Sequence, residues 1–319
     1  MTHVFVTGGT GVLGRPVVRA LLAQGHRVRV LAHSADNERT IRQLGAQPVR
    51  ADLFDPATLP SALGDAEAVL HLATRIPPSD RMGKAAAWAD NDRLRIEGTR
   101  NLVDAALAGQ VQSFLYPSVV LVYPDSGDAW IDARTTPPQP MAFVRSSMDS
   151  EAQVLRFAQA GRRGITLRMG SFYGPQSGHT RDTLAYARKG LAAVLGPAAA
   201  YQSSVWIEDA ARAVVAALER ASSATYDVVD DEPIQRSELV RLIARAAGKS
   251  RVWRLPDWMM GLMLGKDLVA VNSRSQRVSN RAFREVTGWA PQVPSARVGW
   301  LHLTEHSPAV LGEQRLAAR

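Results

Sequence analysis

The residues near the N-terminus whose types and spacing suit chemistry are glycines, and their chemistry is phosphate binding. Gly8, Gly9, Gly11 and Gly14 follow the apolar run Val4–Thr7 and precede a helical pattern. A glycine turn exposes bare backbone N–H groups, and the helix after it adds the positive end of its dipole. The spacing therefore predicts a pyrophosphate site, and a dinucleotide is the expected ligand.

Other chemistries lack the residues they need. The chain has no cysteine, which excludes disulfides, a thiol nucleophile and a zinc–thiolate site. Its seven histidines show no metal-ligand spacing, so we expect no metal. No nucleophile-elbow motif accompanies its serines. The remaining expectation is chemistry that a bound cofactor supplies.

The end of the second predicted strand indicates which nucleotide binds. An NAD binder usually has an acid there to hold the ribose hydroxyls, whereas this chain has His33 and Ser34. Arg15, Arg39 and Arg42 are close in sequence, and cations suit a 2′-phosphate. The sequence favours NADP over NAD. The alternative is that these arginines are solvated residues on helix faces.

The elements that position the glycine turn alternate short β-branched runs with helical stretches, which is typical of a parallel sheet covered on both faces. The predicted strands are Val4–Thr7, Arg27–Leu31, Gln47–Arg50, Ala68–Leu72, Ser113–Ser118 and Ile165–Met169. The predicted helices are Val12–Gln24, Glu38–Leu44, Ala85–Ala108, Phe143–Ala160 and Asp209–Arg220. We expect an α/β fold with a doubly wound parallel Rossmann sheet.

Beyond Gly174 the alternation loosens. Further helices are predicted at Arg236–Ala247, Asp257–Val269 and Ala282–Thr287. We expect a smaller, mainly helical C-terminal substrate cap that is interleaved with the end of the sheet. The predicted division places residues 1–174 and 206–230 in an NADP-binding Rossmann domain, and residues 175–205 and 231–319 in the cap.

Composition argues against several kinds of partner. The net charge of +8 comes almost wholly from arginines that are scattered rather than clustered, so we expect no nucleic-acid partner. No apolar run approaches the roughly 20 residues that span a bilayer, so we expect no membrane partner. The first strand begins too early for a signal peptide, and with the absence of cysteine this predicts a cytoplasmic protein.

Several motifs occur in the order of one family. After the glycine turn come Asp52-Leu53, His71–Thr74, Glu97–Leu102, Leu167–Pro175 and Trp206–Ala213. As a set they resemble the extended short-chain dehydrogenase/reductase family, which contains nucleotide-sugar epimerases and dihydroflavonol-type reductases. The resemblance implies a nicotinamide cofactor, and a homodimer formed through the helices at 85–108 and 143–160.

The resemblance, together with the glycine turn, also implies which residues contact the cofactor. Asp52-Leu53 is expected near adenine and Leu72–Thr74 near the nicotinamide ribose, whereas His71 is expected to be structural. The full predicted set is Gly8, Thr10, Gly11, Val12, Leu13, Gly14, Arg15, His33, Ser34, Asp52, Leu53, Leu72, Ala73, Thr74, Ser118, Met169, Ser171 and Phe172.

The family's catalytic residues are replaced. Its reaction uses a tyrosine, a lysine four residues later, a Ser or Thr, and an Asn. Aligned on the flanking motifs, these four positions hold Phe143, Ser147, Val119 and Arg95. No shifted alignment restores the pair, because no tyrosine in the chain has a lysine four residues later. The standard tyrosine mechanism is absent.

Three side chains are weak candidates for a substitute proton donor: Ser118, Tyr123 and Tyr173. Ser118 adjoins the Ser/Thr position, but strand alternation points it to the opposite face unless the strand end is bulged. The two tyrosines are more naturally walls of a pocket. The sequence therefore offers no donor equivalent to the missing tyrosine.

A reductase remains feasible, because hydride transfer is the cofactor's own chemistry. A ketone beside a phenol could take its proton from that phenol as the alkoxide forms. Apolar and aromatic residues suit such a flat guest, and ordinary core packing is the alternative for each one. The predicted wall is Val119, Met141, Phe143, Met148, Tyr173, Trp258 and Met259.

Loss of the tetrad in an arginine-rich chain resembles the atypical ketoreductases of angucyclinone antibiotic biosynthesis. That resemblance implies NADPH and a polycyclic aromatic ketone. The alternative is a non-catalytic NADP-binding redox sensor, which some relatives without the tyrosine resemble. We predict the ketoreductase, because a sensor need not keep an apolar substrate cap. NADP binding without turnover would favour the sensor.

Overall fold

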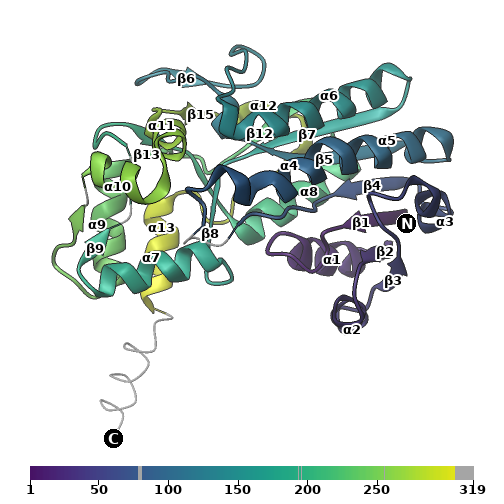
Figure 1. The fold of residues 1–319 in the computed structure, drawn as a ribbon, viewed down its shortest axis with the longest axis horizontal. Coiled ribbons are helices and arrows are strands. Elements are labelled where there is room, and N and C mark those ends of the chain that lie inside the picture. The colour runs from purple at the N-terminus through teal and green to yellow at the C-terminus, as the bar shows by residue number, and fades with distance from the viewer. Residues whose placement is uncertain (78–80, 193, 195, 255, 306–319) are drawn as a thin grey trace, which may run out of the picture.

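A computed structural model describes residues 1–77, 81–192, 194, 196–254 and 256–305. Its centre is a seven-stranded sheet in the order β12-β7-β5-β4-β1-β2-β3 (Figure 1). The strands are β1 (His3–Thr7), β2 (Arg27–Ala32), β3 (Gln47–Arg50), β4 (Ala68–His71), β5 (Ser113–Val119), β7 (Arg163–Met169) and β12 (Ala224–Val228). Every pairing among them is parallel, which confirms the predicted doubly wound Rossmann sheet.

Helices cover both faces of this sheet. On one face α1 (Gly14–Ala23), α2 (Ala35–Gln43) and α8 (Ile207–Arg220) pack on a core that includes Val6 and Leu167. On the other face η1 (Pro56–Thr58), α3 (Leu59–Leu63), α5 (Thr99–Ala108) and α6 (Arg145–Gln159) pack around Phe114 and Phe157. Strands buried on both faces must be apolar nearly throughout, which explains the β-branched runs of the sequence.

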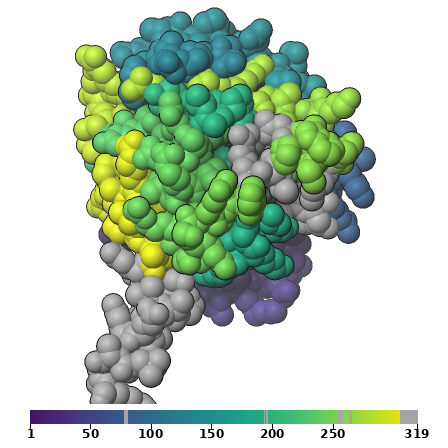
Figure 2. Space-filling model, turned by 90° about the vertical axis from the view of Figure 1, so that its left-hand side faces the viewer, coloured from purple at the N-terminus to yellow at the C-terminus, as the bar shows by residue number. Residues whose placement is uncertain are grey.

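Much of the chain beyond Gly174 gathers at one end of the sheet (Figure 1). It contains α7 (Gly178–Arg188), α9 (Arg236–Ala246), α10 (Asp257–Leu264), α11 (Lys266–Ser273) and α13 (Ala296–Glu305). Tyr173, Ile243 and Trp300 share its apolar core. Figure 2 looks onto this end, where green to yellow residues form most of the surface. By contrast α12 (Arg281–Thr287) packs on the main sheet through Phe283.

Short strand pairs join these parts. They are β6 (Trp130–Ile131) with β15 (Arg277–Val278), β8 (Ser171–Tyr173) with β11 (Ser204–Trp206), β9 (Leu191–Ala192) with β14 (Trp253–Arg254), and β10 (Tyr201–Gln202) with β13 (Ile234–Gln235). The predicted division into two domains stays a prediction, and residues 306–319 of the predicted cap lie outside the described residues. No helix in the described ranges is both long enough and apolar enough to cross a membrane.

Two predicted helices are wrong as single α-helices. Ala85–Ala108 consists of the 3₁₀ turn η2 (Ala85–Trp88), α4 (Ala89–Arg93), the π-helical segment η3 (Leu94–Gly98) and α5. Asp257–Val269 is divided into α10 and α11 by Gly265, whose φ of +81° ends the first helix. Local sequence patterns do not predict α3, α7, α13 and β12, which are short or lie where the alternation loosens.

Candidate active site

The glycine turn after β1 brings backbone segments closer together than side chains would allow. A Cβ on Gly8, where φ is +71°, would lie 2.6 Å from the backbone of Ala73. A Cβ on Gly14 would lie 2.1 Å from the carbonyl oxygen of Gly8. The turn is closed by Gly11 N–H, which donates to that same carbonyl at 3.0 Å. The result is a bare backbone cradle at the N-terminus of α1, and it fits a pyrophosphate.

The predicted cofactor residues lie along one edge of the sheet. Parallel strands place their carboxyl ends together, and each predicted segment follows or ends such a strand. His33-Ser34 follows β2, Asp52-Leu53 follows β3, and Leu72–Thr74 follows β4. Ser118 is next to the last residue of β5, Met169 ends β7, and Ser171 and Phe172 belong to β8. Val12 and Thr74 are exposed at this edge, whereas Leu13, Leu53, Leu72 and Met169 are buried in the core. Their contact with a nucleotide stays a prediction.

His71 belongs to the framework beneath this edge. Its Nδ1 shares a 2.7 Å hydrogen bond with Thr7 Oγ1, and its Nε2 shares one of 3.1 Å with Thr99 Oγ1. Complete burial lowers the pKa of His71 to about 4, so the ring is neutral at pH 7. This geometry ties β1, β4 and α5 together, as expected for a structural residue.

The arginines proposed to read a 2′-phosphate all have acceptors in the structure. The Ser34 hydroxyl caps α2 by accepting from Asn37 N–H at 3.2 Å. Arg39 pairs with Asp36, Arg42 pairs with Glu38 at 3.1 Å, and Arg15 Nε donates to the carbonyl of Thr10 at 2.8 Å. These pairs are exposed and therefore weak, so a phosphate can compete for the arginines.

An apolar cluster occupies the positions of the missing catalytic groups. Phe143, in the 3₁₀ turn η5 (Ala142–Val144), packs edge-on against Trp88 with ring centroids 4.5 Å apart. Val119, Met141 and Met148 join it against Leu268 of α11. The structure thus brings together four of the predicted wall residues. Trp88 and Leu268 were missed, because only the folded chain brings η2 and α11 to this place.

The other predicted wall residues lie elsewhere. Tyr173 is buried in the core of the cap between Trp206 and Trp300. Trp258 and Met259 are on α10, and Trp258 is exposed. Sequence alone could not separate these positions from the cluster around Phe143, since aromatic and methionine residues look alike wherever they pack.

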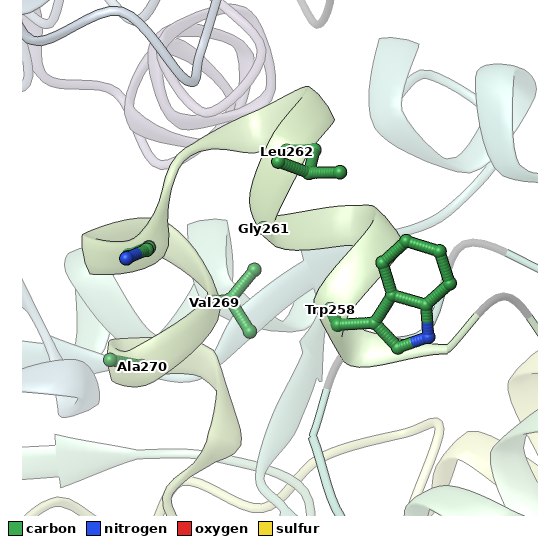
Figure 3. A pocket seen from close by; sticks show the side chains of 6 residues that line it. Trp258, Gly261, Leu262, Val269 and Ala270 are labelled. Carbon is green, nitrogen blue, oxygen red and sulfur yellow. The ribbon is translucent and has the colours of Figure 1, made fainter.

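One cavity adjoins the cluster, and a second shares Lys266 with the first. The smaller, of 190 Å³, is lined by Met82, Gly83, Ala85, Trp88, Asp92, Ala142, Phe143, Gly265, Lys266, Asp267 and Leu268. The larger, of 410 Å³, lies between α10 and α11 and is lined by Trp258, Gly261, Leu262, Lys266, Val269 and Ala270. Figure 3 shows Val269 pointing from α11 toward α10. In the described part of the chain, no tyrosine lines either cavity.

The candidate donors already donate to carboxylates. Ser118 Oγ donates to Glu151 at 2.5 Å. Tyr123 donates to Asp227 at 2.8 Å and Tyr173 to Asp230 at 3.1 Å, and burial raises the pKa of both tyrosines. All three residues are buried. Their catalytic role stays a prediction, and the structure adds that their protons are engaged away from the cavities.

The chain matches a protein family whose ligand fits this geometry. A model of the NAD dependent epimerase/dehydratase family matches residues 4–229. The chain belongs to this family. Its members bind a nicotinamide dinucleotide, and the glycine cradle of this epimerase/dehydratase chain fits that ligand.

Relatives of this epimerase/dehydratase chain include reductases. A 3-diazoavenalumate denitrifying reductase from a Streptomyces species is 31% identical over 93% of this chain and 98% of its own length. A 2-alkyl-3-oxoalkanoate reductase from Shewanella oneidensis is 25% identical over 88% of this chain and 74% of its own. Together with the family, these relatives support an NAD(P)-dependent oxidoreductase.

Solved structures share the fold at lower identity. A human epimerase family protein, solved with NADPH, superposes with a TM-score of 0.78 at 21% identity, covering 96% of this chain and 100% of that one. This likeness extends across the sheet and the cap.

Proposed function

We propose that this chain is an NADPH-dependent ketoreductase of a bulky polycyclic aromatic ketone of the angucyclinone type. The proton comes from the substrate's own phenol. The supporting observation is the apolar cluster in which Phe143 and Val119 replace the family's polar groups. An aromatic guest fits this lining, and a ketone with an internal hydrogen bond does not need the missing tyrosine.

The chain's residues would divide the work as follows. The glycine cradle and α1 hold the pyrophosphate, and bound NADPH supplies the hydride. Phe143 and Trp88 hold a flat ring, while Leu268 of α11 closes the cluster against water. When the carbonyl carbon accepts the hydride, its oxygen takes the phenol proton, which leaves an alcohol and a phenolate. Water later returns a proton to the phenolate.

NADP is the proposed cofactor because the two residues directly after β2 are His33 and Ser34 rather than an acid. The exchange of Asp36 and Glu38 for a 2′-phosphate would give Arg39 and Arg42 a doubly charged partner. The homodimer and the cytoplasmic location remain predictions from the sequence.

Cavity size bears on the substrate. A cavity of about 150 Å³ holds benzene, so the 190 Å³ cavity beside Phe143 accommodates about one ring. A polycyclic substrate would extend past Lys266 into the 410 Å³ cavity between α10 and α11. We therefore assign both cavities to one substrate site, with the reacting carbonyl near Phe143.

A second candidate reaction follows from the Streptomyces relative, whose name specifies a diazo substrate and a denitrifying reduction. Hydride replacement of an aryl diazonium group forms a C–H bond as dinitrogen leaves with the C–N electron pair. That step needs no proton donor, so it also suits a site without the tyrosine. Its substrate can be a single ring, as the smaller cavity favours.

The deciding experiment compares substrates with the purified full chain, by following NADPH oxidation. Polycyclic ketones with an adjacent phenol are paired with their phenol methyl ethers, and an aryl diazonium salt is tested in parallel. We expect the ethers to react about 10²–10⁴-fold more slowly, the typical loss of a general acid. Equal rates would contradict substrate-assisted protonation. Turnover of the diazonium salt alone would select the second reaction, and NADPH binding without any turnover would select the sensor.

A further inference from the structure

Arg95 carries a buried positive charge that makes no direct ion pair in the described part of the chain, and Asp92 is linked to it only through Ser146 Oγ. The residue is only 6% exposed, and its Nε has no hydrogen-bond partner. Its side chain makes one long hydrogen bond, from Nη1 to Ser146 Oγ at 3.5 Å. A buried cation without a direct ion pair, and with an unpaired Nε–H, is costly, so a further acceptor would stabilise this site.

A second orphan donor lies on the adjoining helix. Ser147 is completely buried, and its Oγ has no hydrogen-bond partner. The two helical segments are fixed to each other, because Ser150 Oγ of α6 donates to the carbonyl oxygen of Arg95 at 2.8 Å. Arg95 belongs to η3, and π-helical segments are frequent at functional sites. Arg95 Nε in η3 and Ser147 Oγ in α6 are thus two buried donors without an acceptor.

The location of these donors indicates where the acceptor comes from. Asp92, three residues before Arg95, lines the 190 Å³ cavity and accepts from Ser146 Oγ at 2.6 Å. Phe143, one helical turn before Ser147, lines the same cavity. No residue of the glycine turn lines it. Arg95 and Ser147 do not themselves line the cavity, but each lies about one helical turn from a residue that does, and so closer to the proposed substrate cavity than to the pyrophosphate cradle.

We propose that Arg95 and Ser147 bind an anionic oxygen of the aromatic substrate, namely the phenolate left when the substrate's phenol protonates the alkoxide. This inference rests on the proposed function. In the step, hydride forms the new C–H bond, the carbonyl π electrons move to oxygen, and that oxygen takes the phenol proton. NADPH is oxidised, the ketone is reduced, and the negative charge ends on the phenol oxygen beside Arg95.

Electrostatics explains why this placement helps the reaction. A fixed guanidinium in a dry site stabilises a phenolate far more than a neutral phenol, so it makes the phenol a better proton donor. The charged groups that line the cavity are Asp92, Lys266 and Asp267. Asp92 opposes the effect, and Ser146 Oγ, which donates to Asp92 at 2.6 Å and accepts from Arg95 at 3.5 Å, lies between the two charges. Arg95 supplies the buried charge.

The test is a binding titration that needs no turnover. The probe is 2′-hydroxyacetophenone, a single-ring ketone with an adjacent phenol, added to the full chain with NADP⁺. Its phenolate is followed by absorbance as the pH rises. We expect the bound probe to ionise at least about one pH unit below the free probe, which is a tenfold preference for the phenolate. Arg95→Met should abolish this shift, and Arg95→Lys should keep part of it.

The matched control is Arg93→Met, two residues earlier. Arg93 is exposed and pairs with Glu97 at 2.8 Å, so its loss should leave the probe's ionisation unchanged. Affinity for NADPH is measured for every variant by fluorescence. It should stay within about twofold of the parent chain, because we assign Arg95 to the substrate.

Several results would overturn the assignment. One is a wild-type chain that fails to bind the probe, or that binds it with an unshifted or raised ionisation, and this result needs no folded variant. Another is an Arg95→Met chain that keeps the shift. If Arg95→Met weakened NADPH binding and left the probe's ionisation shift unchanged, Arg95 would be assigned to cofactor binding instead. A normal shift without any ketone turnover would reject only the proposed function and leave the phenolate site standing.

Discussion

The glycine turn after β1 and the α6–η3 edge, defined here as residues 92–98 and 143–151, face the same end of the sheet but differ in how they are built. At the turn, function depends on backbone atoms, and the family pattern from Gly8 to Gly14 is intact. At the edge, function depends on side chains, and the three expected catalytic positions within it hold other residues: Arg95, Phe143 and Ser147. A turn that depends on backbone geometry tolerates few substitutions, whereas one set of functional side chains can be replaced by another.

The edge itself contains two buried arginines in opposite situations. Arg168 reaches it from β7 and is paired with Glu151 at 2.7 Å, and both residues are buried. Arg95 is buried to the same degree without a carboxylate partner in the described chain. The charge of Arg168 is balanced by a carboxylate of the protein. Under our proposal, the charge of Arg95 is balanced by an anionic oxygen of the substrate. Substitutions in each region can therefore separate fold from function.

The largest effect is expected at the turn. In Gly14→Ala the new Cβ meets the Gly8 carbonyl oxygen at 2.1 Å, so the turn must move. We expect the free energy of unfolding to fall by about 4–5 kcal/mol and NADPH binding to be lost. Thermal unfolding and fluorescence titration measure both. Gly178→Ala is the control, since its φ is not positive and the new Cβ would meet only Arg181 Nη2, at 3.9 Å. Intact NADPH binding in Gly14→Ala would refute the backbone cradle.

The paired arginine of the edge should come next. Glu151→Gln leaves Arg168 buried without a counter-charge, which should cost about 3 kcal/mol of folding free energy. Chemical denaturation measures the loss. The matched control, Asp104→Asn, breaks the exposed pair with Arg156 and should cost about 1 kcal/mol or less. A similar cost for both would mean that burial does not distinguish these pairs.

The pH dependence of the free energy of unfolding tests two buried titratable groups, Asp227 and His71. Burial raises the pKa of Asp227 to about 7, although Tyr123 and Ala133 donate to it. The folded chain then holds a proton that the unfolded chain releases near pH 4, so this contribution to stability is lost as the pH rises from about 4 to 7. His71 acts in the opposite sense. Its pKa is lowered to about 4, so its contribution is lost as the pH falls from 6.5 to 4.

Asp227→Asn removes the first of these contributions. Between pH 4 and 7, the slope of unfolding free energy against pH should become more positive by up to about 1.4 kcal/mol per pH unit. Denaturant unfolding at a series of pH values measures it. Asp104→Asn serves again as the exposed control. An unchanged slope would show that Asp227 is ionised in the folded chain throughout this range.

The smallest effect is expected at the adenosine end of the cofactor site. If Arg39 and Arg42 turn from Asp36 and Glu38 to a 2′-phosphate, replacing both with alanine should weaken NADPH binding about tenfold. NADH binding should not change. Isothermal titration measures both affinities, and Arg281→Ala, which breaks an exposed pair on α12, is the control. An equal loss of affinity for NADPH and NADH would show that Arg39 and Arg42 do not bind the 2′-phosphate.

Much of the fold could be read from local patterns. All the predicted strands are present, and the glycine turn lies between the expected strand and helix. These features depend on neighbours in sequence: the apolar runs that a buried parallel strand needs, and the positions where only glycine fits. The helix predicted at Asp257–Val269 failed for the same reason, because its apolar periodicity continues across Gly265 while the backbone does not.

The sequence by itself determined the sheet, the nucleotide turn and the loss of the tyrosine and lysine. Only the tertiary structure decided what replaced them. Arg95 lies 51 residues from Ser146 in the chain, yet the packing of η3 on α6 brings the two into contact and removes both from water. An arginine in a sequence has the same charge whether it is solvated, paired or alone. The electrostatic energy of that charge depends on how deeply it is buried and on which groups lie near it, and residues distant in sequence determine both.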